Sequence, residues 1–216
     1  MLRRTALPLA ILLLTATAAH AQSSRLLRQP SLGPDAIAFT YAADVWTVGA
    51  SGGEARRLTA TPAVESDPHF SPDGQWLAFT SNRSGVPAVY VMPAAGGEPT
   101  RLTWYPSPSW VRGWTPDGRR IVYSTTRETA PTGHERLWTV SREGGPSVVL
   151  PAPWAARGSF SADGRRIAID VMDRWDVEWR NYRGGQNTPL VILDLNTLDE
   201  VLLPNDERTT DVAPVW

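Results

Sequence analysis

The chain has 216 residues with 21 basic and 22 acidic side chains, a formal net charge of −1, so it offers no basic surface for nucleic acid. It has no cysteine, which excludes disulfides, thiolate catalysis and cysteine-ligated metal sites. The length suits one domain, or part of one.

The N-terminal segment, residues 1–21, has the pattern of a secretory signal peptide. Arg3 and Arg4 precede an apolar run from Leu7 to Leu14, and Ala19-His20-Ala21 has the small-x-small pattern of a cleavage site. We therefore expect cleavage after Ala21 and export to the periplasm. No later stretch reaches the roughly 18 to 20 apolar residues that span a bilayer, so we expect no membrane span in the mature chain.

After this segment, one motif recurs at a regular spacing. The sequence FSPDGQWLAF from Phe70 is echoed by WTPDGRRIVY from Trp114 and FSADGRRIAI from Phe160, with a weaker copy, LGPDAIAF, from Leu32. The aspartates of the four copies lie 38, 44 and 46 residues apart, the length of a four-stranded propeller blade. The residues that we expect to form these turns are Asp35, Asp73, Gly74, Asp117, Gly118, Asp163 and Gly164.

The chemistry of the motif favours a β-hairpin. Proline presets φ for a turn, aspartate can accept hydrogen bonds from the nearby backbone, and glycine takes the positive φ that closes the turn. Glycine pairs keep the same period, and each follows a short apolar strand. We expect those strands at Val45 to Val48, Ala88 to Met92, Leu137 to Val140 and Leu190 to Leu195. The sequence therefore predicts an all-β propeller of four-stranded blades.

The repeats set the expected domain organisation. Residues 22–216 form a partial propeller whose blades cover about residues 25–61, 62–105, 106–152 and 153–206, and a fifth blade begins at 207–216. The last residues, Asp211 to Trp216, match Glu65 to Phe70 in placing a proline two residues before an aromatic. We therefore expect a fragment of a larger ring.

At the repeats, the chain resembles the Pro-Asp-Gly propellers of the TolB type. A narrower resemblance rests on DVWTV from Asp44 with GGEARRLT from Gly52, on GWTPDG from Gly113, and above all on WRNYRGG from Trp179. These segments resemble the tricorn protease and its bacterial relatives, and the likeness spans residues 25 to 216.

The resemblance implies a six-bladed N-terminal propeller that gates or channels peptides towards a serine peptidase core, with a second, seven-bladed propeller and a PDZ module between them. It implies peptide or unfolded-protein substrates and a possible homo-oligomer. The catalytic segments of that family are absent from this sequence, so no catalytic residue is assigned. The predicted signal peptide departs from tricorn itself, which is cytosolic.

Neither catalysis nor a cofactor is indicated by the residues themselves. His69 occupies a strand position of a repeat and His134 a polar loop, and no Gly-x-Ser-x-Gly elbow accompanies either. The acidic cluster at Asp170, Asp173, Asp176 and Glu178 matches no calcium loop and is interleaved with arginine, which favours ion pairs over a metal. We expect no metal and no cofactor.

The segment from Asp173 to Gln186 is the candidate for peptide or partner contact, because aromatic and arginine side chains are typical of such contacts. These candidate residues are Trp175, Trp179, Tyr182 and Arg183. A structural plug against the next blade or over the channel mouth is the alternative, and it is favoured. Trp104 and Trp110 flank a proline-containing loop, where packing between blades is favoured over binding.

Three functions remain open from the sequence. The first is the propeller of an exported tricorn-like serine peptidase, whose catalytic core lies outside this chain. The second is a stand-alone TolB-type binding propeller of the periplasm. The third is a propeller ahead of an amidohydrolase or a prolyl-oligopeptidase-type hydrolase. The Tyr-Arg-Gly-Gly segment from Tyr182 places the first ahead.

Overall fold

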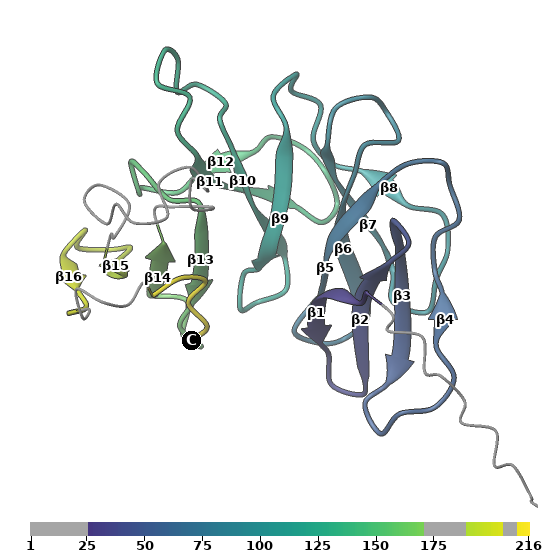
Figure 1. Cartoon of the computed structure of the whole chain (residues 1–216). Helices are drawn as coiled ribbons and strands as arrows, with labels where there is room; N and C mark the ends of the chain where they lie inside the picture. The colour runs from purple at the N-terminus through teal and green to yellow at the C-terminus, as the bar shows by residue number, and fades with distance from the viewer. Residues whose placement is uncertain (1–25, 171–188, 205–210) are drawn as a thin grey trace, which may run out of the picture.

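The computed structural model describes residues 26–170, 189–204 and 211–216, so the predicted signal peptide lies outside the described residues. Every regular element of the described part is a β-strand, and the strands form four sheets that follow one another in an arc (Figure 1). The strands are β1 (Arg28–Leu32), β2 (Ala36–Tyr41), β3 (Asp44–Gly49), β4 (Arg56–Arg57), β5 (Glu65–Phe70), β6 (Trp76–Ser81), β7 (Ala88–Pro93), β8 (Thr100–Arg101), β9 (Ser109–Trp114), β10 (Arg120–Thr125), β11 (Arg136–Ser141), β12 (Val148–Val149), β13 (Arg157–Phe160), β14 (Arg166–Asp170), β15 (Val191–Asp194) and β16 (Glu200–Leu202).

Each sheet contains four consecutive strands in sequence order, and every pairing is antiparallel. The sheets are blade 1 (β1 to β4), blade 2 (β5 to β8), blade 3 (β9 to β12) and blade 4 (β13 to β16). The first strand of a blade contacts the first strand of the next, so β1, β5, β9 and β13 form the inner edge of the arc. The predicted all-β fold of four-stranded blades is confirmed.

The Pro-Asp-Gly turns connect the first two strands of a blade. In blade 2, Ser71 Oγ donates to Asp73 Oδ1 at 2.5 Å, and Asp73 Oδ1 also accepts from the N–H of Gln75 at 3.0 Å. Thr115 and Asp117 repeat the first contact at 2.6 Å. In blades 2, 3 and 4 the glycine that follows the aspartate has a φ between 66° and 69°, the left-handed conformation that favours glycine.

These contacts make the contribution of the turn aspartates to folding stability depend on pH. The neighbouring hydroxyl, above all, and then backbone N–H groups lower the pKa of Asp73 and Asp163, and the hydroxyl of Thr115 lowers the pKa of Asp117. A carboxylate with a depressed pKa in the folded state stabilises the fold above its unfolded pKa, which is about 3.9, and the stabilisation is lost as the pH falls through the folded value.

We expect the triple variant Asp73→Asn, Asp117→Asn and Asp163→Asn to lose stability less steeply than the parent as the pH falls from about 5 to below the depressed pKa values, because the proton-linked groups are gone. Urea unfolding midpoints across this range measure the difference. Parallel pH profiles of the two proteins would contradict the assignment.

The hydrophobic core lies between the blades. Strand β6 shows the alternation, since Leu77 and Phe79 pack towards blade 1 while Ala78 packs towards blade 3. Three buried clusters fill the successive junctions: Ala38, Val45, Leu77, Phe79, Ala88, Tyr90 and Met92 between blades 1 and 2; Ala78, Val89, Val91, Leu102, Val111, Ile121, Tyr123, Trp138 and Val140 between blades 2 and 3; and Val122, Leu137, Ala152, Ala155, Ile167, Ile169 and Leu193 between blades 3 and 4. Each blade is thus stabilised by its neighbours.

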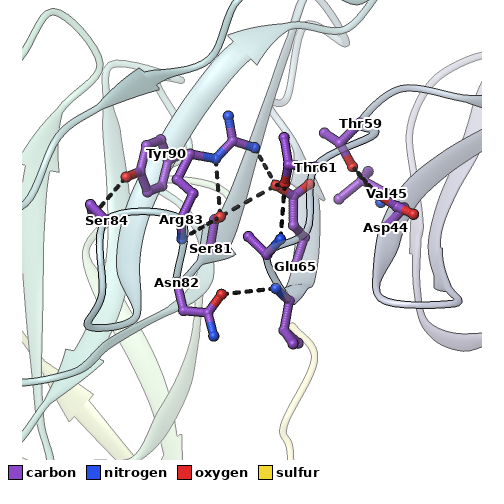
Figure 2. A network of polar contacts seen from close by, with 12 residues as sticks. Asp44, Val45, Thr59, Thr61, Glu65, Ser81, Asn82, Arg83, Ser84 and Tyr90 are labelled. Atoms are coloured by element: carbon purple, nitrogen blue, oxygen red, sulfur yellow. Dashed lines mark hydrogen bonds and ion pairs between the residues drawn. The ribbon is translucent and has the colours of Figure 1, made fainter.

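One charged group is enclosed at the start of blade 2. Glu65 is fully buried, and its carboxylate accepts hydrogen bonds from the side chains of Arg83, Ser81 and Thr61 (Figure 2). The Arg83 guanidinium also lies over the ring of Tyr90, 4.9 Å from its centroid. The buried carboxylate therefore depends on Arg83 for its charge compensation.

Candidate functional site: an axial pocket

The inner edge of the arc holds a pocket of about 580 Å³. Residues of all four inner strands line it, together with Ala213, Pro214 and Val215. The last three follow blade 4 in the chain and lie beside β13, because Trp216 N donates to Ser159 Oγ at 3.0 Å. Residues of five successive segments thus line one space, and we call it the axial pocket.

Most of the inner segments carry an irregularity next to the axial pocket. Gln29, Asp67 and Ala213 each have a φ between 51° and 53°, and each precedes a proline. The pairing registers of β1 and β5 shift at these places. A proline lacks the N–H of a regular ladder, so a bulge at this point accommodates it. The same device recurs because the sequence repeats.

The bulges link blade 1 to blade 2 directly. Gln29 Nε2 donates to Asp67 Oδ1 at 2.7 Å, and Gln29 Oε1 accepts from the N–H of Asp67 at 3.2 Å. One side chain thus satisfies both the carboxylate and the amide of the neighbouring bulge. The inner edge is held in a defined shape where it faces the pocket.

The charged side chains of the pocket have partners. The guanidinium of Arg112 donates to Ser124 Oγ at 2.9 Å and forms an ion pair with Glu135 at 3.5 Å. Arg157 also has an interaction partner. Enclosure by the protein lowers the pKa of His69, and Asp67 opposes this shift. Since the ordinary pKa of histidine is about 6.5, the imidazole is uncharged at neutral pH.

Two aromatic rings stand on adjacent inner strands. Trp114 ends β9, and its Nε1–H donates to the carbonyl of His69 at 2.9 Å, which fixes the ring between blades 2 and 3. Phe160 ends β13 and packs on the core between blades 3 and 4. Both rings are half-buried and line the axial pocket. The wall of the axial pocket therefore consists of these two aromatic rings together with residues of the inner strands.

The other histidine of the described residues, His134, lies outside the axial pocket. His134 contacts Thr132 Oγ1 at 2.7 Å and the carbonyl of Pro153 at 3.1 Å, and its ring packs on Trp154. These contacts give it a structural role in the loop.

Within residues 26–170, 189–204 and 211–216, no group of three histidine or acidic residues is placed to hold a metal ion. No helix in the described part of the chain is long and apolar enough to cross a membrane.

Only some of the residues that the sequence analysis singled out lie in the described part of the structure. The contact candidates Trp175, Trp179, Tyr182 and Arg183 lie outside the described residues. The expectation that Trp104 packs between blades is wrong, because 74% of it is exposed and its ring lies against Arg101, 4.5 Å from the guanidinium. Trp104 lies in the segment that follows the outer strand β8, where a side chain reaches solvent as easily as the next blade.

The axial pocket was not predicted from the sequence. The sequence signal was a proline at the same repeat position in three segments: Pro30 lies two residues before Leu32, Pro68 before Phe70 and Pro214 before Trp216. From the sequence, the position of these prolines predicted the start of a fifth blade but not a pocket. That the same prolines bulge the inner edge follows from their backbone conformation.

Comparison with known proteins places this geometry in context. The family model of the tricorn protease N-terminal beta propeller domain matches residues 24–216. Tricorn protease homolog 1 of Streptomyces coelicolor is 36% identical over 160 residues, which cover 74% of this chain and 15% of that protein. This chain therefore spans only a small part of the relative's length.

Solved structures share the fold. The crystal structure of the tricorn protease superposes with a TM-score of 0.68 at 23% identity, covering 83% of this chain and 18% of that one. The structure of a TolB from Agrobacterium tumefaciens, described as putative, gives a TM-score of 0.67 at 19% identity and covers 84% of this chain and 63% of that one. Both similarities concern the arrangement of the blades.

Proposed function

Because the chain belongs to the family of tricorn protease N-terminal β-propeller domains, we propose that it is the peptide-gating propeller of an exported serine peptidase. The observation that carries the proposal is the axial pocket, which residues of five successive inner segments line. Peptides enter or leave along the inner edge, and hydrolysis takes place in a catalytic core outside this chain. The pattern of residues 1–21 supports export to the periplasm.

The chemistry of the axial pocket suits passage better than reaction. Its arginines already have partners, and its histidine is uncharged at neutral pH. The half-buried rings of Trp114 and Phe160 can pack on the side chains of an unfolded peptide. Such a surface holds many sequences without a strict preference, as a gate for peptides requires.

A bulky group in the pocket tests the proposal. Val215 lines the pocket, so Val215→Cys in a full-length background without other reactive cysteines can carry a polyethylene glycol maleimide there. In the full-length protein we expect the modified variant to degrade an unfolded protein substrate about tenfold more slowly, because the gate is blocked. Val148→Cys, on the outer strand β12 with 53% exposed, is the matched control.

Two results would contradict the proposal. Equal degradation rates for the modified Val215→Cys and Val148→Cys proteins would show that substrates do not pass through the axial pocket. A full-length protein that fails to react with a serine-directed fluorophosphonate would replace the peptidase assignment with a binding propeller.

A further inference from the structure

We propose that the axial pocket binds an extended peptide by adding it as a strand to the edge of β13, with one apolar side chain of the peptide between Trp114 and Phe160. The inference rests on the proposed function and specifies its ligand as a neutral main chain in the extended conformation. Such strand addition supplies affinity through backbone hydrogen bonds and depends little on sequence.

The pairing of β13 is regular, and within the described part of the chain its other edge joins no ladder. This strand is the first of its sheet, and among the described strands it pairs with β14 alone, in unbroken register from Arg157 to Phe160. The N–H of Ser161 donates to the carbonyl of Arg166 at 2.9 Å. Since bonded and non-bonded pairs alternate in an antiparallel ladder, the N–H and C=O groups of Gly158 and Phe160 point away from β14, towards the axial side.

The corresponding edges of the other inner segments are obstructed. Pro30, Pro68 and Pro214 interrupt the edges of β1, β5 and the last described segment, and a proline has no N–H to donate. In β9 the pairing register with β10 shifts between Val111 and Gly113. A bulge of this kind disrupts strand addition. Among the inner segments that the structure describes, β13 best fits a flat incoming strand.

At the junction between blades 3 and 4, a glycine stands where a serine accepts a backbone hydrogen bond at two other junctions. The side chain of Ser31 in blade 1 accepts the N–H of Phe70 in blade 2 at 3.3 Å, and that of Ser159 accepts the N–H of Trp216 at 3.0 Å. The same repeat position in blade 3 is Gly113, which has no side chain to accept the N–H of Phe160. The pocket lies at this junction, so the amide is available to a ligand.

The polar side chains favour a neutral ligand over an anion. Arg112 is already paired with Glu135, and its Nε–H is bound by Ser124. His69 is uncharged at neutral pH because its pKa is lowered. The groups left for recognition are the backbone edge and the two rings. Both match an extended peptide whose side chains alternate between the two faces.

Methylation of single amides in a peptide probe tests the inference. The probe is a fluorescent, capped pentapeptide of threonine and valine with a central phenylalanine, added to the full-length protein after inactivation with a fluorophosphonate. In a strand only every second N–H faces the partner strand. We expect methylation of those amides to weaken binding by about tenfold, through loss of a hydrogen bond and crowding, and methylation of the intervening amides to have little effect.

Matched protein variants locate the site. Phe160→Ala should weaken binding of the unmethylated probe up to about tenfold, whereas Phe70→Ala, at the same repeat position in blade 2 and outside the pocket, should change it little. A methylation scan without alternation, or equal losses in both variants, overturns the inference. The Val215→Cys experiment can still succeed in that case, so the two proposals fail separately.

Discussion

Arg83→Ala is expected to lower the free energy of unfolding by about 3–5 kcal/mol, because it leaves the fully buried carboxylate of Glu65 without its counter-charge. One oxygen of this carboxylate, Oε2, already has no hydrogen-bond partner within the described residues, so the remaining hydroxyl contacts cannot replace the guanidinium (Figure 2). Urea denaturation of the parent and the variant measures the loss.

Two further variants separate charge compensation from packing. Arg83→Lys keeps a positive charge but loses the planar group over Tyr90, so we expect a smaller loss than for alanine. The double variant Glu65→Leu with Arg83→Met removes both charges and should recover most of the stability. A loss below about 1 kcal/mol for Arg83→Ala would mean that the ion pair behaves like an exposed one and that Glu65 is reached by water.

Gly74→Ala is expected to destabilise the protein more than Gly164→Ala, although both glycines occupy the same repeat position. Their φ values are 68° and 69°, so a left-handed alanine costs about 1–2 kcal/mol at either site. At Gly74 the new Cβ would lie 2.8 Å from Cδ of Pro34 in the preceding turn. Overpacking of this kind adds about 1–3 kcal/mol. At Gly164 the nearest atom, of Pro116, is 3.8 Å away.

The comparison tests whether the Pro-Asp-Gly turns of neighbouring blades stack on one another. Thermal or urea unfolding of both variants gives the two losses. In a Pro34→Ala background, which removes the crowding atoms, the costs of the two glycine substitutions should converge. If Gly74→Ala and Gly164→Ala cost the same in the parent, the first two turns are not in contact in solution.

The sequence predicts the blades because their information is local. The motif from Phe70 to Phe79 carries its own turn chemistry, and the hydroxyl, carboxylate and glycine are in place in the structure as separate copies. The tricorn resemblance and the propeller fold are both confirmed by the comparisons. The periodic sequence is sufficient to predict the blades, because each blade packs against its neighbours in the same way.

The axial pocket and the buried ion pair could not be predicted in the same way. Gln29 contacts Asp67 across 38 positions of the sequence, and no local pattern links them. Glu65 stands where blade 3 has Ser109, so the ion pair is not a property of the repeat. Its partner Arg83 lies in a turn whose composition alone suggests an exposed side chain. Such pairs depend on how two blades meet.

Hydrogen–deuterium exchange of the full-length, fluorophosphonate-inactivated protein, with and without a saturating extended peptide, tests the central claim most directly. If peptides occupy the axial pocket, the amides of β13 and of residues 211–216 become protected, while the outer strands β4, β8, β12 and β16 exchange as before. Protection confined to the outer strands would place the binding surface elsewhere on the blades and contradict the axial pocket as the path of the peptide.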